Sequence, residues 1–310
     1  MFVKQNKEKR FLKRDTSENI QYYLMMSGTL VLVFIFFYLP LFGIIISFQD
    51  YIAGKPFFGE GVEWVGLKWF KEFTSSHYFK RIIRNTLRIN IMGLAFGFFV
   101  PIFFALVVNE IRISKFKKFT QTVSYLPHFL STVIVAGMAT RLIADGGVVT
   151  QFLHKIGIEA NALNANVAFF PWLYTIVTVW KGFGWSSILY LSTLSAIDPG
   201  QYEAAAIDGA GRIKRIWYVT LPNMAPLITI QFIMSIGGML ASNTDLILVL
   251  YNGAVFESAD VIGTYIYRES LGGGKYSYGT ACGLLMSILS FALTYIANAI
   301  SRAKTDYSMW

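Results

Sequence analysis

The chain has 310 residues, of which 55% are hydrophobic and 15% charged, with a mean hydropathy of +0.50. Ordinary soluble domains are about 25% charged, so this composition excludes intrinsic disorder and favours a protein embedded in a lipid bilayer. The single cysteine, Cys282, excludes an intrachain disulfide and a cysteine-based metal cluster. The net charge of +9 is compatible with nucleic acid or with a membrane protein, and the positions of the basic residues decide between them.

Six apolar segments are long enough to cross a bilayer, which requires about 20 residues per helix. The sequence therefore predicts an all-α polytopic membrane protein with six transmembrane helices. The predicted spans are 24–48, 86–108, 119–140, 167–195, 225–241 and 278–300. The fourth span is interrupted at residues 181–184, where Gly182 and Gly184 are expected to loosen the helix.

Lysine and arginine residues orient these spans. With the N-terminus in the cytoplasm, the inner segments hold 15 basic residues and the longer outer segments hold 10. This is the positive-inside pattern, so both termini are predicted to be cytoplasmic and nucleic-acid binding is disfavoured. The expected parts are a basic cytoplasmic tail (1–23), one membrane domain (24–300) and a cytoplasmic C-terminal tail (301–310). The first apolar run is too long for a secretory signal and is expected to be retained in the cytoplasmic membrane.

Residue patterns for catalysis are scarce in this chain. Neither HExxH nor GxSxG occurs, and the three histidines are scattered (His77, His128 and His154). The run Gly272–Lys275 is no Walker A motif, because Glu269 and Tyr276 stand where a glycine and a Ser or Thr are required. We therefore predict no catalytic residue, metal site or cofactor on this chain. Transport would then depend on an ion gradient or on another subunit.

One inner loop, residues 198–222, differs from the others. Asp198-Pro199 suits the start of a helix, because the aspartate caps it and proline fits its first turn. Asp208-Gly209 supplies a turn, and a basic amphipathic helix follows from Arg212 to about Tyr218, stopped by Pro222. We expect a short helix–turn–helix at the cytoplasmic surface that another protein can approach closely. The alternative is an amphipathic loop that rests on lipid headgroups.

This loop resembles the cytoplasmic coupling signature of permease subunits of binding-protein-dependent ABC importers, EAA-x3-G-x9-I-x-LP. Val219 replaces the usual isoleucine, and the other anchors are present at their spacing: Glu203, Ala204, Ala205, Gly209, Leu221 and Pro222. Segments 84–87, 109–112 and 121–128 resemble the carbohydrate branch of the family, the maltose-type and polysaccharide permeases. The resemblance covers about residues 20–305. It implies the MetI-like fold of type I importer permeases.

The resemblance also implies a set of partners. The helix around Glu203 would dock into a groove on a cytoplasmic ATPase, whose ATP-driven closure would swing the spans between inward- and outward-facing states. The candidate coupling residues are Glu203, Ala204, Ala205, Asp208, Gly209, Leu221 and Pro222. ATP and magnesium would belong to two ATPase copies and not to this chain. A homologous second permease in a heterodimer and an extracytoplasmic solute-binding protein would complete the complex.

Lys181 is an ionisable residue inside a predicted span and lies close to two tryptophans, which makes it a candidate for cargo contact. The alternative is an interfacial lysine that extends to the headgroups. Small polar residues of the fifth span share one face, although such residues also pack helices together. Arg88 is interpreted as an interfacial anchor or an inter-subunit pair. The resemblance to maltose-type permeases points by position to Trp185, Ser235, Met239 and Asn243. Together with Lys181 and Asp245 these are the candidate pathway residues.

The sequence thus predicts a non-catalytic permease subunit that forms half of the pathway of an oligosaccharide importer. Lys181 favours an acidic, uronate-containing cargo. A gradient-driven secondary transporter of a small polar solute is the alternative; it favours inverted repeats and membrane-embedded acids, and the predicted spans contain no clear Asp or Glu. A membrane enzyme is disfavoured because catalytic clusters are missing.

Overall fold

The computed structural model describes residues 19–59, 61–160, 162–305 and 307–310. Almost all regular structure in these ranges is helical, and the β-pairing found there is an isolated bridge between Gln49 and Trp64. The prediction of an all-α protein is therefore confirmed. The larger part of the predicted basic tail, residues 1–18, lies outside the described residues.

The helices follow one another in a fixed order along the chain. After a first long helix (Asn19–Phe48), whose second half contains η1 (Phe34–Tyr38) and η2 (Leu39–Phe48), come α2 (Lys68–Ser75), α3 (Phe79–Asn109), α4 (Ser114–Tyr125), η3 (Leu126–Phe129), α5 (Thr132–Ile143), α6 (Val148–Lys155) and η4 (Leu163–Ala165). The second half of the chain forms α7 (Phe170–Ala196), α8 (Pro199–Ile207), α9 (Arg212–Arg215), η5 (Ile216–Thr220), α10 (Leu221–Gly237), η6 (Gly238–Leu240), α11 (Thr244–Leu250), α12 (Phe256–Ala259), α13 (Ile262–Ile266), η7 (Tyr267–Gly272) and α14 (Tyr276–Lys304).

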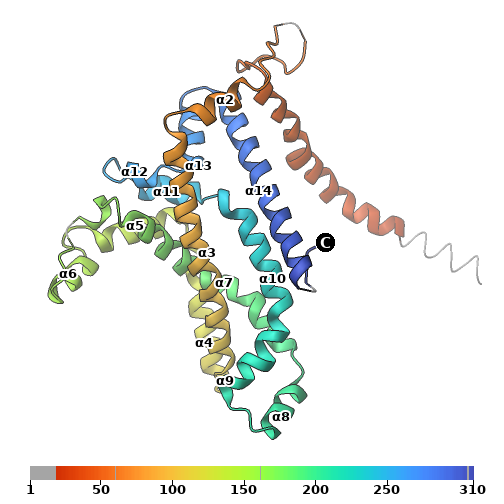
Figure 1. Ribbon diagram of the computed structural model, residues 1–310, viewed down its shortest axis with the longest axis vertical. Coiled ribbons are helices and arrows are strands. Elements are labelled where there is room, and N and C mark those ends of the chain that lie inside the picture. Colours follow the sequence, from red (N-terminus) through yellow and green to blue (C-terminus); the bar gives the residue numbers. More distant parts are fainter. Residues whose placement is uncertain (1–18, 60, 161, 306) are drawn as a thin grey trace, which may run out of the picture.

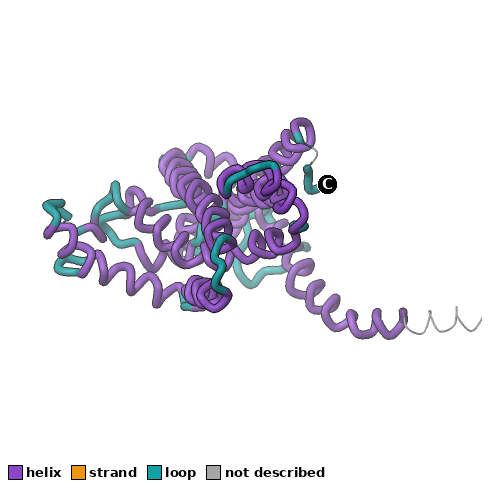
Figure 2. The backbone as a smooth tube through the Cα atoms, turned by 90° about the horizontal axis from the view of Figure 1, so that it is seen from below, coloured by secondary structure: helices purple, strands orange, loops and turns teal. Residues whose placement is uncertain are grey.

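The long helices α3, α10 and α14 run along the long axis of the molecule (Figure 1). One end of this bundle carries α2 and the other carries α8, and we refer to them as the α2 end and the α8 end. The first helix leads away from the bundle in both views (Figures 1 and 2). None of its most apolar stretch is buried within the chain.

Five described helices are long and apolar enough to cross a membrane, against the six that the sequence predicts. They are Asn19–Phe48, Phe79–Asn109, Thr132–Lys155, Arg212–Leu240 and Tyr276–Lys304. The third of these contains α5 and α6 together with the turn 144–147 that separates them. The 27 residues of α7 span about 40 Å at 1.5 Å per residue, which is also sufficient length. Its composition is less apolar, because polar side chains such as Lys181 interrupt it.

The predicted third span, 119–140, is not one helix. Helix α4 ends at Tyr125, a short 3-10 turn contains Pro127, and α5 begins at Thr132. The side chain of Ser131 accepts a hydrogen bond from the N–H of Ile134 (3.3 Å) and so caps the new helix. Proline removes a backbone donor and Ser131 supplies a start, so the chain changes direction here.

Helix α7, by contrast, is continuous through residues 181–184, and the expected interruption is wrong. Its two glycines differ in their surroundings. A Cβ on Gly184 would clash with the backbone carbonyl of Ser124 in α4, whereas a Cβ on Gly182 would have open space. Gly184 therefore permits a close approach of α4 and α7 and does not loosen the helix.

Three apolar clusters hold the helices together. One lies at the α2 end between α2, α3, α13 and α14 and contains Phe73 and Tyr278. A second joins α5, α7 and α11 around Leu173 and Ile247, and a third joins α3, α7 and α10 around Ala105. Helix α3 contributes to all three clusters and α7 to two, so the other elements pack against these two helices.

Candidate functional site

The helix that carries the predicted coupling residues, α8, forms as expected. The carboxylate of Asp198 accepts a hydrogen bond from the N–H of Gly200 (2.9 Å), and Pro199 occupies the first helical position. An N-cap aspartate followed by proline satisfies the free donors at a helix start. The predicted start of this helix is therefore confirmed.

Helix α8 ends in a Schellman turn. The N–H of Ala210 donates to the carbonyl of Ala205 (2.9 Å), and the N–H of Gly209 donates to that of Ala206 (3.1 Å). Gly209 has φ +75°, a left-handed conformation in which a Cβ is unfavourable. The glycine of the signature is thus required by the backbone of the turn, before any partner is considered.

The expectation that Pro222 stops the second helix of the loop is wrong. A single helix runs from Arg212 to Leu240, and Pro222 lies inside it. The five residues before Leu221 form a π-helical turn, in which the N–H of Leu221 donates to the carbonyl of Ile216. A π-turn shifts the hydrogen-bond register, so the missing N–H of proline is tolerated. The turn after α8 therefore leads directly into a membrane helix.

The two faces of α8 have different surroundings. Gln201, Tyr202 and Ala205 lie at helical spacing on the face toward η5 and α10. The opposite face exposes Glu203 and Ala204 together with Ile207, which is 88% exposed. Of the other predicted coupling residues, Asp208, Gly209 and Pro222 are exposed, whereas Ala205 and Leu221 are half-buried. The sequence interpretation missed Ile207, an apolar side chain at the tip of the hairpin.

Two adjoining cavities of about 390 and 360 Å³ lie between α3, α7 and α10. They share three lining residues and together form what we refer to as the groove. Four of the six predicted pathway residues line it: Trp185, Ser235, Met239 and Asn243. Polar and aromatic residues that sequence reasoning missed line it as well: Asn90, Phe98, Tyr174, Thr178, Tyr190 and Gln231. The structure therefore unites side chains from three helices that are far apart in the sequence.

Lys181 lies beside the groove and does not line it. Its ammonium is 3.4 Å from the backbone carbonyl of His128, in the 3-10 turn that separates α4 from α5. The ring of His128 stacks on Trp185, with centroids 4.6 Å apart and an angle of 3° between the rings. Lys181 therefore contacts the backbone of His128, and the ring of His128 covers one face of Trp185. This arrangement places a positive charge close to a tryptophan that lines the groove.

The break between α10 and α11 lies at the edge of the groove. The side-chain amide of Asn90 donates to the carbonyl of Met239 (2.9 Å) and to the hydroxyl of Ser242 (3.1 Å), and the N–H of Asn243 donates to the hydroxyl of Tyr174 (3.0 Å). These bonds satisfy polar groups of a non-helical segment that borders the groove, where irregular backbone is tolerated in a membrane protein. Asp245 is exposed in the first turn of α11 and lies outside the groove.

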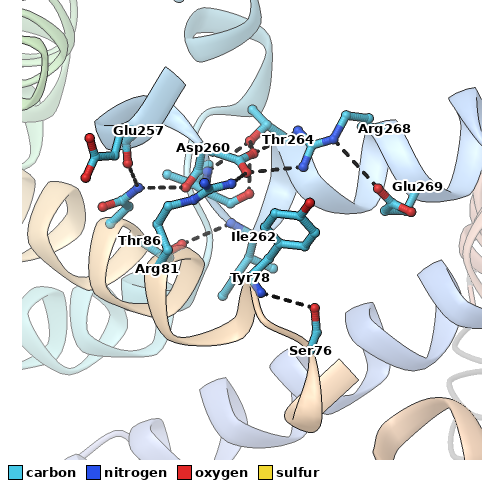
Figure 3. Close-up of polar contacts among 12 residues, drawn as sticks. Ser76, Tyr78, Arg81, Thr86, Glu257, Asp260, Ile262, Thr264, Arg268 and Glu269 are labelled. Atoms are coloured by element: carbon cyan, nitrogen blue, oxygen red, sulfur yellow. Dashed lines mark hydrogen bonds and ion pairs between the residues drawn. The ribbon is translucent and has the colours of Figure 1, made fainter. Parts of the chain in front are cut away.

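A charged network at the α2 end was not foreseen. Asp260 is 1% exposed and lies between two arginines from different parts of the chain (Figure 3). Arg81 of α3 is 3.0 Å from one carboxylate oxygen, and Arg268 of η7 contacts both oxygens at 3.0 and 3.1 Å. The hydroxyl of Thr264 donates to the same carboxylate (3.0 Å). A buried charge is tolerated only when it is paired and hydrogen-bonded in this way.

This network joins the chain between α11 and α14 to the start of α3. Asn85 donates to the backbone carbonyls of Glu257 (2.7 Å) and Asp260 (3.0 Å). Burial lowers the pKa of Arg268, but its hydrogen bonds to Asp260 and the charge of that carboxylate outweigh burial and raise the pKa overall. Arg88, expected to be an interfacial anchor or an inter-subunit pair, lies two turns after Arg81 in α3 and is exposed. In the described ranges no group of three or more His, Cys, Asp or Glu residues is arranged to hold a metal ion.

Comparison with known proteins defines the class to which these features belong. The family described as the binding-protein-dependent transport system inner membrane component matches residues 97–306. The chain belongs to this family, and it is a non-catalytic permease subunit, a multi-pass protein of the inner membrane, without a cofactor of its own. The prediction of an ABC importer permease of the carbohydrate branch is confirmed, and the alternative of a gradient-driven transporter is set aside.

Individual relatives are similar along almost the whole chain. The polygalacturonan/rhamnogalacturonan transport system permease protein YteP of Bacillus subtilis (strain 168) is 38% identical, over 97% of this chain and 94% of its own. Protein LplB of the same organism is 36% identical, over 90% and 88%. A chain in the crystal structure of a bacterial alginate ABC transporter, in complex with alginate pentasaccharide-bound periplasmic protein, superposes with a TM-score of 0.85 at 34% identity, over 96% of this chain and 99% of that chain.

Proposed function

We propose that this chain forms half of the translocation pathway of an ATP-driven importer for acidic, uronate-containing oligosaccharides. The observation that carries the proposal is the groove, in which aromatic and amide side chains from α3, α7 and α10 meet inside a membrane domain. A relative at 38% identity is named for polygalacturonan/rhamnogalacturonan transport, and a solved transporter at 34% identity is described as an importer of the acidic polysaccharide alginate. Relatives at 26–27% identity are named for arabinooligosaccharides and sn-glycerol-3-phosphate, so the acidic cargo rests on the two more similar proteins.

The chemistry of the groove suits a sugar chain. Trp185, which is 46% exposed, can stack on a pyranose ring, and the amides of Asn90 and Gln231 can bond hydroxyl groups. Lys181 supplies a positive charge close to Trp185, where a uronate carboxylate would otherwise be unpaired in a region of low dielectric. The pathway residues proposed are Lys181, Trp185, Ser235, Met239 and Asn243, with Asn90 and Gln231 added; Asp245 is left out because it lies away from the groove.

The α8 end is assigned to the cytoplasm, because the inner loops and tails carry the excess of basic residues. In this topology α7 also crosses the membrane, which raises the number of spans from five to six, and the α2 end faces the solute-binding protein. Two ATPase copies would bind α8 of this chain and the equivalent helix of a second, homologous permease in a heterodimer. Closure of the ATPase dimer would move α8, and the helix that follows it would carry this movement to the groove.

Transport by the complete complex tests this proposal. The chain is coexpressed with its partner permease, ATPase and binding protein, reconstituted in proteoliposomes, and supplied with labelled oligogalacturonate or a neutral malto-oligosaccharide of equal length. We expect ATP-dependent uptake of the acidic oligosaccharide and ATP hydrolysis stimulated by the loaded binding protein. Uptake that follows an ion gradient without ATP would contradict the proposal, and preference for the neutral sugar would remove the acidic cargo from it.

A further inference from the structure

The coupling helix α8 is joined to the rest of the chain by short covalent connections. Two residues, Ile197 and Asp198, separate it from α7, and the turn 208–211 separates it from the helix that begins at Arg212. That turn contains Gly209 and Gly211, and glycine leaves a backbone many accessible conformations. The covalent connections alone therefore allow α8 to pivot relative to α10.

A side-chain pair limits this pivot. The hydroxyl of Tyr202, in the first half of α8, lies 3.1 Å from the hydroxyl of Thr220, the last residue of η5. Thr220 is 3% exposed, and its hydroxyl is also 3.4 Å from the carbonyl of Arg215. The geometry is consistent with a chain in which Tyr202 donates to Thr220 and Thr220 donates to Arg215. Thr220 immediately precedes Leu221, where α10 begins.

Two further hydrogen bonds join α8 and the turn after it to the helix that begins at Arg212. The side-chain amide of Asn223 donates to the side-chain carbonyl of Gln201 (2.8 Å), one residue before Tyr202. The guanidinium of Arg215 donates to the carbonyl of Ala210 (2.8 Å) and so ties the turn to the same helix. Helix α8 is therefore attached to η5 and the base of α10 through its first half, and the turn that follows α8 is attached to α9.

We propose that Tyr202 and Thr220 are a positioning pair, which makes α8 and the base of α10 move as one rigid body and so transmits the ATPase movement to the groove. The proposal rests on the proposed function of α8 as the ATPase-docking helix. Neither hydroxyl lies on the exposed docking face of Glu203, Ala204 and Ile207. The pair therefore affects transmission and not docking, and the two effects are separable by experiment.

The test uses the reconstituted complex and two variants that remove one hydroxyl each while keeping the shape, Tyr202→Phe and Thr220→Val. The control is Tyr218→Phe on the same helix, where the tyrosine is 79% exposed. The quantity measured is the number of ATP molecules hydrolysed per oligosaccharide imported, together with the ATPase stoichiometry after purification. We expect this ratio to rise about threefold to tenfold in both variants, the factor that the loss of one hydrogen bond implies.

Three further results distinguish transmission from a general structural defect. The double variant should be no worse than Thr220→Val alone, because Thr220→Val already removes the bond that Tyr202→Phe removes. Thr220→Ser, which keeps the hydroxyl, should restore the wild-type ratio. The ATPase should copurify with every variant at the wild-type stoichiometry.

An unchanged ratio in Tyr202→Phe and Thr220→Val would overturn the inference while leaving the proposed function intact. Loss of the ATPase from these variants would also overturn it, because the pair would then act on docking. Failure of the wild-type chain to copurify with an ATPase would contradict the proposed function itself.

Discussion

At the α2 end the chain pairs a buried carboxylate with its own arginines, whereas at the α8 end it leaves charged and apolar side chains open to a partner. Asp260 is enclosed by Arg81, Arg268 and a threonine hydroxyl, and an apolar cluster packs beside it. Helix α8 instead exposes Glu203 and Ile207, and its side chains bond to η5 and to the base of α10. The α2 end is therefore stabilised within the chain, whereas the exposed face of α8 is available to a partner.

This difference separates stability from coupling. A buried ion network becomes costly when one member is removed, because the remaining charges lose their compensation. An exposed helix contributes little to the stability of its own chain, and its substitution acts on the partner. Substitutions at the α2 end should therefore lower the free energy of unfolding, and substitutions at the α8 end should disturb assembly or coupling in a folded protein.

The largest loss of stability is expected from Asp260→Asn, which leaves Arg81 and Arg268 facing a neutral side chain. The free energy of unfolding should fall by about 3 kcal/mol, toward the lower end for a broken buried pair because both arginines remain partly exposed. Thermal unfolding of the purified protein in detergent measures the change. Glu257→Gln, a matched change at an exposed carboxylate nearby, is the control. If Asp260→Asn and the wild-type protein unfold at the same temperature, the ion network does not stabilise the α2 end.

An intermediate loss is expected from Gly184→Ala, at the contact of α4 and α7 between the two ends. The added methyl group meets the backbone carbonyl of Ser124, which cannot rotate away as a side chain would. Overpacking of this kind costs about 1–3 kcal/mol. Gly182→Ala, two residues away in open space, is the matched control. If both variants unfold at the same temperature, α4 and α7 are not in close contact in the membrane.

At the α8 end, Glu203→Lys and Gly209→Asp should leave the free energy of unfolding within about 1 kcal/mol of wild type. The cost of Gly209→Asp comes from its φ of +75°, whereas a Cβ there meets no other atom of the chain. Both variants should lose ATPase copurification or ATP hydrolysis stimulated by the binding protein. Gly209→Asn, which tolerates the same backbone without a charge, should be less impaired. If Glu203→Lys and Gly209→Asp transport at the wild-type rate, α8 and the turn after it are not the coupling element.

The smallest effect on stability is expected from Lys181→Met, which gives up one contact of 3.4 Å to the His128 carbonyl. Uptake of an acidic oligosaccharide should fall more than uptake of a neutral one, because the variant removes a charge and keeps the length of the side chain. Transport assays with both cargos in proteoliposomes measure this selectivity. Unchanged uptake of both would make Lys181 a packing residue of the helix break.

Two prolines show how far the sequence could predict the helices. Pro127 was placed inside one span, yet the chain breaks there, because Ser131 caps a new helix. Pro222 was expected to end a helix, yet the helix continues, because a π-turn before it absorbs the missing N–H. The hydrophobic pattern indicates where helices exist, but whether a proline breaks a helix depends on hydrogen bonds formed by its neighbours.

The coupling helix could be predicted from the sequence, whereas most of the groove and the Asp260 network could not. The signature around Glu203 and Gly209 is local, so its spacing alone places the hairpin. Asn90 and Tyr174 line the groove and bond to the segment that follows α10. Asn90 bonds to Met239, 149 positions away, and Tyr174 bonds to Asn243, 69 positions away. Arg81 and Asp260 are 179 positions apart, and no periodicity in a single sequence relates them. Long-range polar pairs of this kind require the fold to be known.

Hydrogen–deuterium exchange of the permease complex with and without its ATPase tests the contrast between the two ends most directly. Backbone amides of residues 199–211 should exchange rapidly in the complex without ATPase and become protected when the ATPase binds. Amides of residues 256–272, around Asp260, should be protected equally in both cases. Strong protection of residues 199–211 before the ATPase is added, or no change after it binds, would contradict the account of α8 as a docking helix.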